Sequence, residues 1–199
     1  SGINSEVLYY VPLDKTYEVW KVKVTNASDV KRRLTVTGFC EFTNDNNYEQ
    51  DQVNLQYTLF ITRTFFENNK IMQFINENCV DSPVNGNSAV QRFLGLAGAP
   101  VDTYCGDKEE FLGRYHTYAD PVGIINGDCG NKLNYNGNGC GALSTKLELE
   151  PGETKEFAFV LGMKDGKAAD EILSRYEDSA KTCADELKEL KTYWHGKLN

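Results

Sequence analysis

The chain has 199 residues, 40% of them hydrophobic and 12% aromatic, so we expect one domain with a real core. Its net charge of -8 argues against nucleic acid and anionic membranes, which need clustered Lys and Arg, but is compatible with uncharged partners such as sugars. No apolar run reaches the roughly 18 residues that span a bilayer, and the N-terminus lacks the pattern of a signal peptide.

The cysteines are interpreted as mostly free thiols of a cytoplasmic protein. A chain of this length does not need disulfides, and the spacings of Cys40, Cys79, Cys105, Cys129, Cys140 and Cys183 are irregular. No C-x-x-C occurs and the only histidines are His116 and His195, so we expect neither a zinc site nor a cofactor. A disulfide between Cys129 and Cys140 stays open.

Two alternating segments open the chain. In "EVWKVKVTN", Trp20, Val22 and Val24 share one face, and in "RRLTVTGFCEF" the shared face carries Leu34, Val36, Cys40 and Phe42. The short polar stretch "NASD" between them predicts an antiparallel hairpin. Asn26-Ala27-Ser28 also fits a glycosylation sequon, but turn chemistry is the preferred interpretation, and Lys31–Arg33 is interpreted as a solvated turn.

The middle of the chain predicts three more strands. "LQYTLFITRTFF" and "KIMQFINENC" form a pair that turns at "ENNK", and "VQRFLGLAGAP" is an apolar strand with small residues. The Gly/Asn-rich segment "INGDCGNKLNYNGNGCG" is expected to be a loop with several positive φ angles rather than a phosphate cradle, because no helix follows it.

The clearest hairpin predicted from the sequence is "LSTKLELEPGETKEFAFVLG". Leu143, Leu147 and Leu149 alternate with polar residues before a turn at Glu150–Glu153, and Phe157, Phe159 and Leu161 follow on the return strand. No strand–helix alternation is present, so a parallel sheet is not expected.

After Gly166 the apolar period changes to three or four residues, which predicts an amphipathic helix, or two helices broken near Asp178-Ser179. The apolar stripe consists of Ile172, Tyr176, Ala180, Cys183, Leu187, Leu190 and Trp194. The predicted fold is therefore mainly β: an antiparallel, supersandwich-like β-sandwich over residues 1–165, followed by a C-terminal helical segment over residues 166–199.

The stretch "EEFLGRYHTYADP" concentrates polar and aromatic side chains. Glu109 and Glu110 are adjacent, so they cannot face each other as a glycosidase acid pair and are expected to be solvated. Strand alternation would place Arg114, His116 and Tyr118 on one face, which suits a polar ligand; a general base at His116 and a plain surface stay open. Asp51, Asn54 and Gln56 in "DQVNLQ" are either sugar contacts or ordinary turn residues.

Five stretches in order resemble the N-terminal sandwich domain of glycoside hydrolase family 94, formerly glycosyltransferase family 36. This family contains inverting cellobiose, cellodextrin and chitobiose phosphorylases. The stretches are "SEVLYYVPLDKTYEVWKVKVTNASDVKRRLTVTGFCEF", "DQVNLQ", "DKEEFLGRYHTYADPVGIINGDCGN", "LELEPGETKEFAFVLG" and "ELKELKTYW". Together they cover nearly the whole chain.

The resemblance implies that phosphate attacks the anomeric carbon while a carboxylic acid on a following (α/α)6 barrel protonates the leaving oxygen. The chain ends at "YWHGKLN", where that barrel would begin, so no catalytic residue is expected in it. The sandwich would pack on the barrel, take part in a homodimer and lend residues to the acceptor end of a site for a β-linked glucose disaccharide or oligosaccharide. The family's Y-R-E-R-R stretch is reduced here to Gln91-Arg92, which would contact the acceptor.

Two functional hypotheses follow. The first is a non-catalytic sandwich domain of a disaccharide phosphorylase; the second is a free-standing β-glucan-binding module, which an aromatic platform from Tyr104, Tyr115, Tyr118 or Tyr135 would favour. An independent hydrolase has no credible acid or nucleophile constellation. Without a barrel, Leu187, Leu190 and Trp194 would lose their cover, so we expect the helix to dimerise or to fold back on the sheet.

Overall fold

The structure is a computed structural model that describes residues 2–42, 62–75 and 91–198. Asn54, Gln56 and Asp51 lie outside these ranges. The described strands are β1 (Ile3–Tyr10), β2 (Tyr17–Asn26), β3 (Arg32–Glu41), β4 (Thr62–Glu67), β5 (Lys70–Ile75), β6 (Gln91–Ala97), β7 (Thr103–Asp107), β8 (Gly139–Leu149) and β9 (Thr154–Met163). The helices are α3 (Lys108–Leu112), α4 (Val122–Ile125), α5 (Gly166–Ser174) and α6 (Ser179–Leu198).

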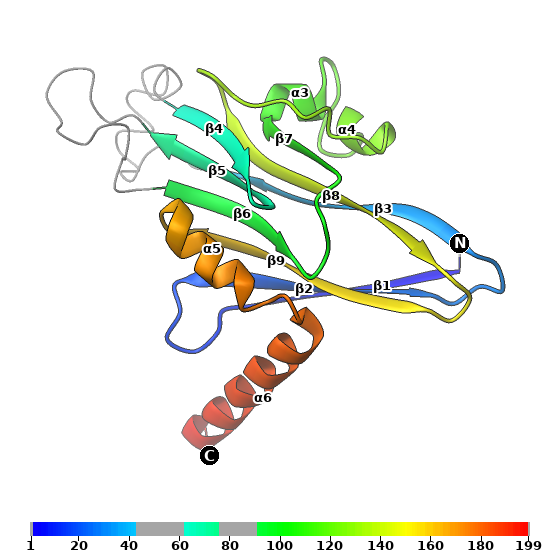
Figure 1. Cartoon of the computed structure of the whole chain (residues 1–199), viewed down its shortest axis with the longest axis vertical. Helices are drawn as coiled ribbons and strands as arrows, with labels where there is room; N and C mark the ends of the chain where they lie inside the picture. The colour runs from blue at the N-terminus through cyan, green and yellow to red at the C-terminus, as the bar shows by residue number, and fades with distance from the viewer. Residues whose placement is uncertain (1, 43–61, 76–90, 199) are drawn as a thin grey trace, which may run out of the picture.

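Two antiparallel sheets form a sandwich (Figure 1). The larger sheet has the strand order β1-β2-β9-β6-β5-β4, and the smaller has the order β3-β8-β7. Helices α3 and α4 lie beside the smaller sheet, α5 lies on the larger sheet, and α6 projects away from the sandwich. The predicted class, a mainly β antiparallel sandwich with a C-terminal helix, is confirmed.

Strand pairing differs from the predicted hairpins. β2 pairs with β1 and β9, whereas β3 pairs with β8 in the other sheet, so the predicted β2–β3 hairpin is wrong. β8 and β9 likewise belong to different sheets, although the turn at Glu150–Glu153 is present, with Gly152 at φ 78°. Both connections are arches that cross from one sheet to the other. The sequence did not indicate this, because alternation along a strand identifies its inward face but does not identify the strand that pairs with it.

The predicted inward faces are confirmed. Every residue assigned to them belongs to, or packs against, one core cluster between the two sheets. These residues are Trp20, Val22, Val24, Leu34, Val36, Cys40, Phe42, Leu143, Leu147, Leu149, Phe157, Phe159 and Leu161. The β4–β5 hairpin is also confirmed, and Asn68 and Asn69 at its turn both have positive φ, as a two-residue type I′ turn requires.

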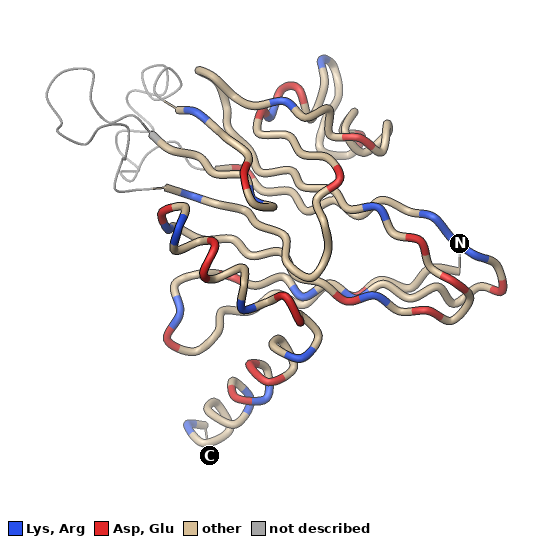
Figure 2. The backbone as a smooth tube through the Cα atoms, in the orientation of Figure 1, with Lys and Arg blue, Asp and Glu red and all other residues tan. Residues whose placement is uncertain are grey.

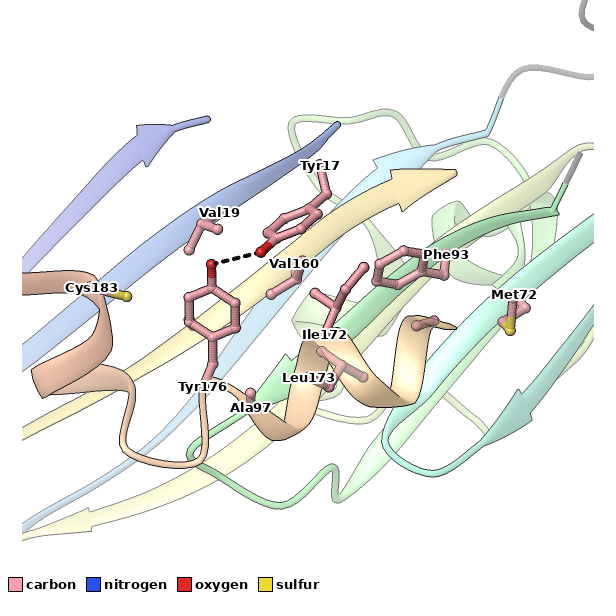
Figure 3. Close-up of a cluster of buried hydrophobic side chains, with 12 residues drawn as sticks. Tyr17, Val19, Met72, Phe93, Ala97, Val160, Ile172, Leu173, Tyr176 and Cys183 are labelled. Atoms are coloured by element: carbon pink, nitrogen blue, oxygen red, sulfur yellow. Dashed lines mark hydrogen bonds between the residues drawn. The ribbon is translucent and has the colours of Figure 1, made fainter. Parts of the chain in front are cut away.

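The other face of the larger sheet is covered by α5 (Figure 3). Ile172 and Leu173 pack on the sheet, and a Cβ on Gly95 of β6 would lie 2.6 Å from Leu173, so this glycine permits close approach of the helix. Lys70 of β5 is completely buried beneath α5, and its Nζ lies 2.6 Å from Asp170 Oδ1 and 3.3 Å from Glu67 Oε1. Apolar packing and a buried cation together fix α5 on the sheet.

The apolar stripe predicted after Gly166 lies on two helices, α5 and α6. This confirms the alternative of two helices broken near Asp178-Ser179. Tyr176 lies in the break, where its hydroxyl reaches Tyr17 at 3.4 Å (Figure 3). Tyr176 and Tyr10 both donate to Glu186 of α6, at 2.9 and 2.8 Å. Ala180 is exposed, contrary to the predicted stripe, because Ser179 takes the buried position and donates to the Ala97 carbonyl oxygen.

The distal part of α6 leaves the sandwich. Cys183 is buried, Leu187 and Leu190 are half-buried, and Trp194 is 53% exposed. Of the two alternatives expected for this helix, folding back on the sheet is wrong for the part beyond Cys183, and dimerisation through the helix stays a prediction. Figure 2 shows acidic and basic residues interspersed along the helix.

Candidate functional surface beside α3

A short helix is fixed at the end of the smaller sheet. Asp107, the last residue of β7, caps α3 by accepting hydrogen bonds from the backbone N–H groups of Glu109 and Glu110 at 3.0 and 3.1 Å. Phe111 is buried and stacks on Phe39 of β3, with ring centroids 4.9 Å apart. Burial raises the pKa of Asp107, against the effect of the two N–H donors.

An ionic contact joins α3 to the end of β3. Lys108 Nζ lies 2.9 Å from Glu41 Oε2 and 5.5 Å from the ring centroid of Tyr118, and the Tyr118 hydroxyl donates to Glu41. Partial burial opposes ionisation of Glu41, but the hydrogen bonds from Tyr118 and Lys108 outweigh it and lower the pKa of this carboxyl group. The carboxylate thus anchors both α3 and the loop that follows it.

The segment Arg114–Tyr118 is not a strand, so the predicted common face of Arg114, His116 and Tyr118 is wrong. Gly113, at φ 85°, ends α3, and Tyr115 also has positive φ and is 96% exposed. His116 Nδ1 lies 2.9 Å from Asp120 Oδ2, within a local turn that defeats the strand alternation. Hydrogen bonds from the hydroxyl and N–H of Thr117, and then from His116, lower the pKa of Asp120.

Segment 134–138 connects α3 to the larger sheet. Asn138 donates to Glu109 Oε1 at 3.1 Å, and the Gly137 carbonyl oxygen accepts from Thr62 of β4 at 3.0 Å. The Asn134 N–H donates to Thr64 Oγ1 at 2.7 Å. Positive φ angles at Gly127, Gly130, Asn131 and Asn136 confirm the loop predicted for this region. At this end of the sandwich, polar contacts of α3 and of segment 134–138 therefore connect β3 and β7 of the smaller sheet to β4 of the larger one.

Arg92 lies inside the sandwich. It is 5% exposed, and alternation along β6 places it on the same face as Leu94, toward the core between the sheets. Its register partner on β5 is Gln73, which is also buried. The neighbouring Gln91 is half-buried and lies on the opposite face. The acceptor-contact role of these two residues stays a prediction.

The four tyrosines considered as an aromatic platform separate into two groups. Tyr104 stacks on Phe66, with centroids 4.0 Å apart, and is therefore a packing residue. Tyr115, Tyr118 and Tyr135 are exposed on the α3–β8 connection. Glu41, Lys108 and Asn138, which hold this surface together, were not predicted; the Glu41–Lys108 contact spans 67 positions and leaves no local signal.

Within residues 2–42, 62–75 and 91–198, no group of three or more His, Cys, Asp or Glu side chains is arranged to hold a metal ion. None of the described helices is long and apolar enough to cross a membrane. The five described cysteines are free thiols.

A family model described as "Glycosyl hydrolase 94, supersandwich domain" matches residues 1–179. The chain belongs to this family. The N,N'-diacetylchitobiose phosphorylase of Vibrio furnissii is 29% identical over 194 residues, which are 98% of this chain and 23% of that protein. The solabiose phosphorylase of Paenibacillus borealis is 26% identical over 180 residues, which are 87% of this chain and 22% of that protein.

The supersandwich domain thus spans less than a quarter of the length of these relatives. A solved structure of a putative kojibiose phosphorylase from the human microbiome aligns with 98% of this chain and 23% of its own, at a TM-score of 0.41 and 11% identity. The family resemblance predicted from the sequence is confirmed. Within the described residues, the surface beside α3 carries the exposed rings of Tyr115, Tyr118 and Tyr135, and the far end of α6 carries those of Tyr193 and Trp194.

Proposed function

We propose that this chain is the non-catalytic sandwich domain of a cytoplasmic glycoside phosphorylase, which cleaves a β-linked glucose disaccharide with inorganic phosphate. One observation carries the proposal: the chain matches the supersandwich family over residues 1–179 and corresponds to 23% of a chitobiose phosphorylase. The catalytic acid and the phosphate site would lie in the remaining, helical part of such a protein.

The C-terminal helical segment, residues 166–199, would lead into that catalytic domain. α5 is fixed on the sheet, whereas the far end of α6 presents Trp194 and Leu198 to solvent, beside the half-buried Leu190. An exposed apolar strip on a helix that leaves its own core favours cover by another packed element. In this proposal the cover is the helical catalytic domain, and the sandwich also contributes to a homodimer.

The surface beside α3 would face the acceptor sugar. It combines an exposed ring at Tyr118, the charged group Lys108 and the carboxylate Glu41, all held by mutual contacts. Such a mixture suits a sugar, because an aromatic face packs on the ring while charged groups bind hydroxyls. Arg114, Tyr115 and His116 lie on the same loop and are exposed.

A second function, a free-standing β-glucan-binding module, is favoured by the three exposed tyrosines. Tyr115, Tyr118 and Tyr135 all lie on the connection between β7 and β8. Exposed aromatic rings bind sugar faces without a catalytic domain.

Two measurements on the purified chain separate these functions. The first is phosphate-dependent turnover of a panel of β-linked disaccharides; we expect none, and any reproducible turnover would refute a non-catalytic role. The second is an NMR titration with cellobiose and cellotetraose to millimolar concentration. No saturable shifts are expected for the phosphorylase domain, whereas saturable shifts at Tyr115, Tyr118 and Tyr135 would establish the binding module.

Tyr115→Ala and Tyr118→Phe are matched variants for the titration. Tyr115 makes no ring contact in the described residues and can be removed without touching the core. Tyr118→Phe keeps the ring and removes only the hydroxyl that reaches Glu41. In a binding module, Tyr115→Ala would weaken sugar binding, while Tyr118→Phe would retain most of it.

A further inference from the structure

Asn-Gly steps recur in the connection between β7 and β8. Three of them lie in the described residues: Asn126-Gly127, Asn136-Gly137 and Asn138-Gly139; a further one, Asn85-Gly86, lies outside them. An Asn-Gly step can close into a ring, because glycine has no side chain to shield its backbone nitrogen from the side-chain carbonyl carbon of the preceding Asn. Closure requires that this nitrogen and the Asn side chain are both free to move. The three steps have the same sequence, and their surroundings distinguish them.

The Asn126-Gly127 step is held by the last turn of α4. The Asn126 N–H donates to the Val122 carbonyl oxygen at 2.9 Å, and the Gly127 N–H donates to the Ile124 carbonyl oxygen at 3.0 Å. The nitrogen that would attack therefore already carries a hydrogen bond, and the helical turn has to open before a ring can form.

The Asn138-Gly139 step is held on both sides. The Asn138 side-chain amide donates to Glu109 Oε1 at 3.1 Å, and its carbonyl oxygen accepts from the Lys108 N–H at 3.0 Å. Gly139 is the first residue of β8, is buried, and pairs with Asp107 of β7. Neither the side chain nor the glycine of this step is free to rotate.

The Asn136-Gly137 step differs from both. Asn136 is exposed, and among the described residues neither its side-chain amide nor the Gly137 N–H has a hydrogen-bond partner. The contacts of this step lie at its two ends, where the Asn136 N–H donates to the Thr62 carbonyl oxygen at 3.2 Å and the Gly137 carbonyl oxygen accepts from Thr62 Oγ1 at 3.0 Å. Asn136 also has φ 73°, in a region that few residues other than glycine prefer. The reacting atoms are therefore free, and the native backbone angle is not a strongly favoured one.

We propose that Asn136 is a deamidation site of the folded chain. The Gly137 backbone nitrogen attacks Cγ of Asn136, the Cγ–Nδ2 bond breaks, and ammonia leaves with the proton of the Gly137 N–H. The resulting succinimide takes up one water molecule. Opening between the ring nitrogen and Cγ gives aspartate, and opening between the ring nitrogen and the main-chain carbonyl carbon gives isoaspartate, whose main chain runs through Cβ and Cγ. One water enters, one ammonia leaves, and no oxidant or cofactor is consumed.

This modification would alter the surface beside α3. Tyr135, one of its exposed rings, directly precedes the site, and a Cβ placed on Gly137 would lie 3.8 Å from Glu109 Oε2. The product adds a negative charge next to this acidic side chain, and isoaspartate also adds a CH2 group to the main chain between the two contacts with Thr62. We therefore expect Tyr135 to change its surroundings. The inference concerns the chemistry of this loop and does not rest on the proposed function.

The test is incubation of the folded chain in mildly alkaline buffer, with samples digested at intervals and analysed by mass spectrometry. Fragment ions assign each converted Asn through the replacement of NH2 by OH. We expect Asn136 to react at least about fivefold faster than Asn126 or Asn138, because each of these must first lose one or more hydrogen bonds. An isoaspartate methyltransferase should label the peptide that contains Asn136. A smaller ratio, or no conversion at Asn136, would overturn the proposal.

The same incubation in urea separates structure from sequence. Unfolding removes the hydrogen bonds at Gly127 and Asn138, so the three rates should become comparable. A preference for Asn136 that persists in urea would assign it to sequence context and overturn the structural argument.

Asn136→Gly is the control for the effect on the surface. Glycine adopts φ 73° without strain and has no side-chain amide to lose. The NMR signals of the Tyr135 ring should change during incubation of the wild-type chain and stay constant in this variant. Signals that drift equally in both chains would contradict an effect of the Asn136 product on Tyr135.

Discussion

The side-chain amide of Asn26, at the end of β2, donates a hydrogen bond of 3.0 Å to the carbonyl oxygen of Leu149, at the end of β8. The two residues are 123 positions apart and belong to different sheets. The same amide nitrogen lies 2.8 Å from the carbonyl oxygen of Val30 and 3.1 Å from that of Glu150. One buried amide therefore joins the two arches that close this end of the sandwich.

Asn26→Ala should destabilise the chain by about 2–3 kcal/mol, because it leaves buried carbonyl oxygens without their donor. Asn26→Asp has the same shape but replaces the donor with a carboxylate, so it should be at least as destabilising. Urea denaturation followed by circular dichroism measures both. Asn4→Ala, on the exposed face of β1, is the control and should stay within about 0.5 kcal/mol of the wild type. An unchanged midpoint for Asn26→Ala would mean that the apolar core alone holds the arches.

Asp170→Asn should lower the free energy of unfolding by about 2 kcal/mol, because it removes the negative charge that pairs with the ammonium group of the fully buried Lys70. Glu67, at 3.3 Å, limits the loss. Lys70→Met should cost less than Asp170→Asn, since it removes the buried charge and leaves Asp170 partly solvated. Thermal unfolding of the two variants gives the order directly. The reverse order would show that the ion pair itself, rather than the cost of an uncompensated cation, dominates.

The Glu41 carboxyl group should titrate below its ordinary pKa of 4.5 in an NMR experiment on the side-chain carboxyl carbon. Tyr118→Phe and Lys108→Met should each raise this pKa, and Lys23→Met, on the exposed face of β2, should not. A lowered folded-state pKa stabilises the folded chain above the unfolded-state pKa, and this contribution is lost as the pH falls through the folded-state value. Tyr118→Phe should therefore flatten the acid limb of the stability curve.

Trp194→Ala should change the free energy of unfolding by no more than about 0.5 kcal/mol, because the far end of α6 contacts solvent. Leu173→Ala on α5 should cost about 2–4 kcal/mol, because Leu173 is buried against Gly95. Comparable losses for the two variants would reveal a packed α6 tip, for example in a dimer, which analytical ultracentrifugation would detect.

Inward-facing residues could be predicted from the sequence, but strand neighbours could not. Leu147 and Phe157 were assigned to the core because alternation is a local property of each strand. The two residues lie in different sheets, and this arrangement depends on contacts such as that between Asn26 and Leu149. These residues are 123 positions apart, so a local sequence pattern cannot reveal their contact. A turn with Pro and Gly serves a hairpin and an arch equally well, so the turn at Glu150–Glu153 was right and the pairing was wrong.

The candidate surface was harder to predict than the core. Helix α3 has five residues, too few for a helical period, although Asp107 followed by Glu109 and Glu110 is an N-cap pattern that could have indicated it. Arg92 illustrates the opposite problem, since a charged residue is expected at a surface but is buried here, between the two sheets and opposite the buried Gln73. Tyr115 and Tyr118 were named for a possible aromatic platform, and both are exposed, although the strand expected to present Tyr118 is a series of turns.

A small change in the tilt of helix α6 at its anchored start is enlarged into a larger displacement at its C-terminal end. Its root is held by Tyr10 and Tyr176 through Glu186, while a 20-residue helix extends for about 30 Å, much of it beyond that anchor. A tilt of about 10° at the root would displace the tip by roughly 3–5 Å, given that length. The direction in which α6 leaves the sandwich thus depends on two tyrosine hydroxyls and one carboxylate, together with the buried Ser179 and Cys183.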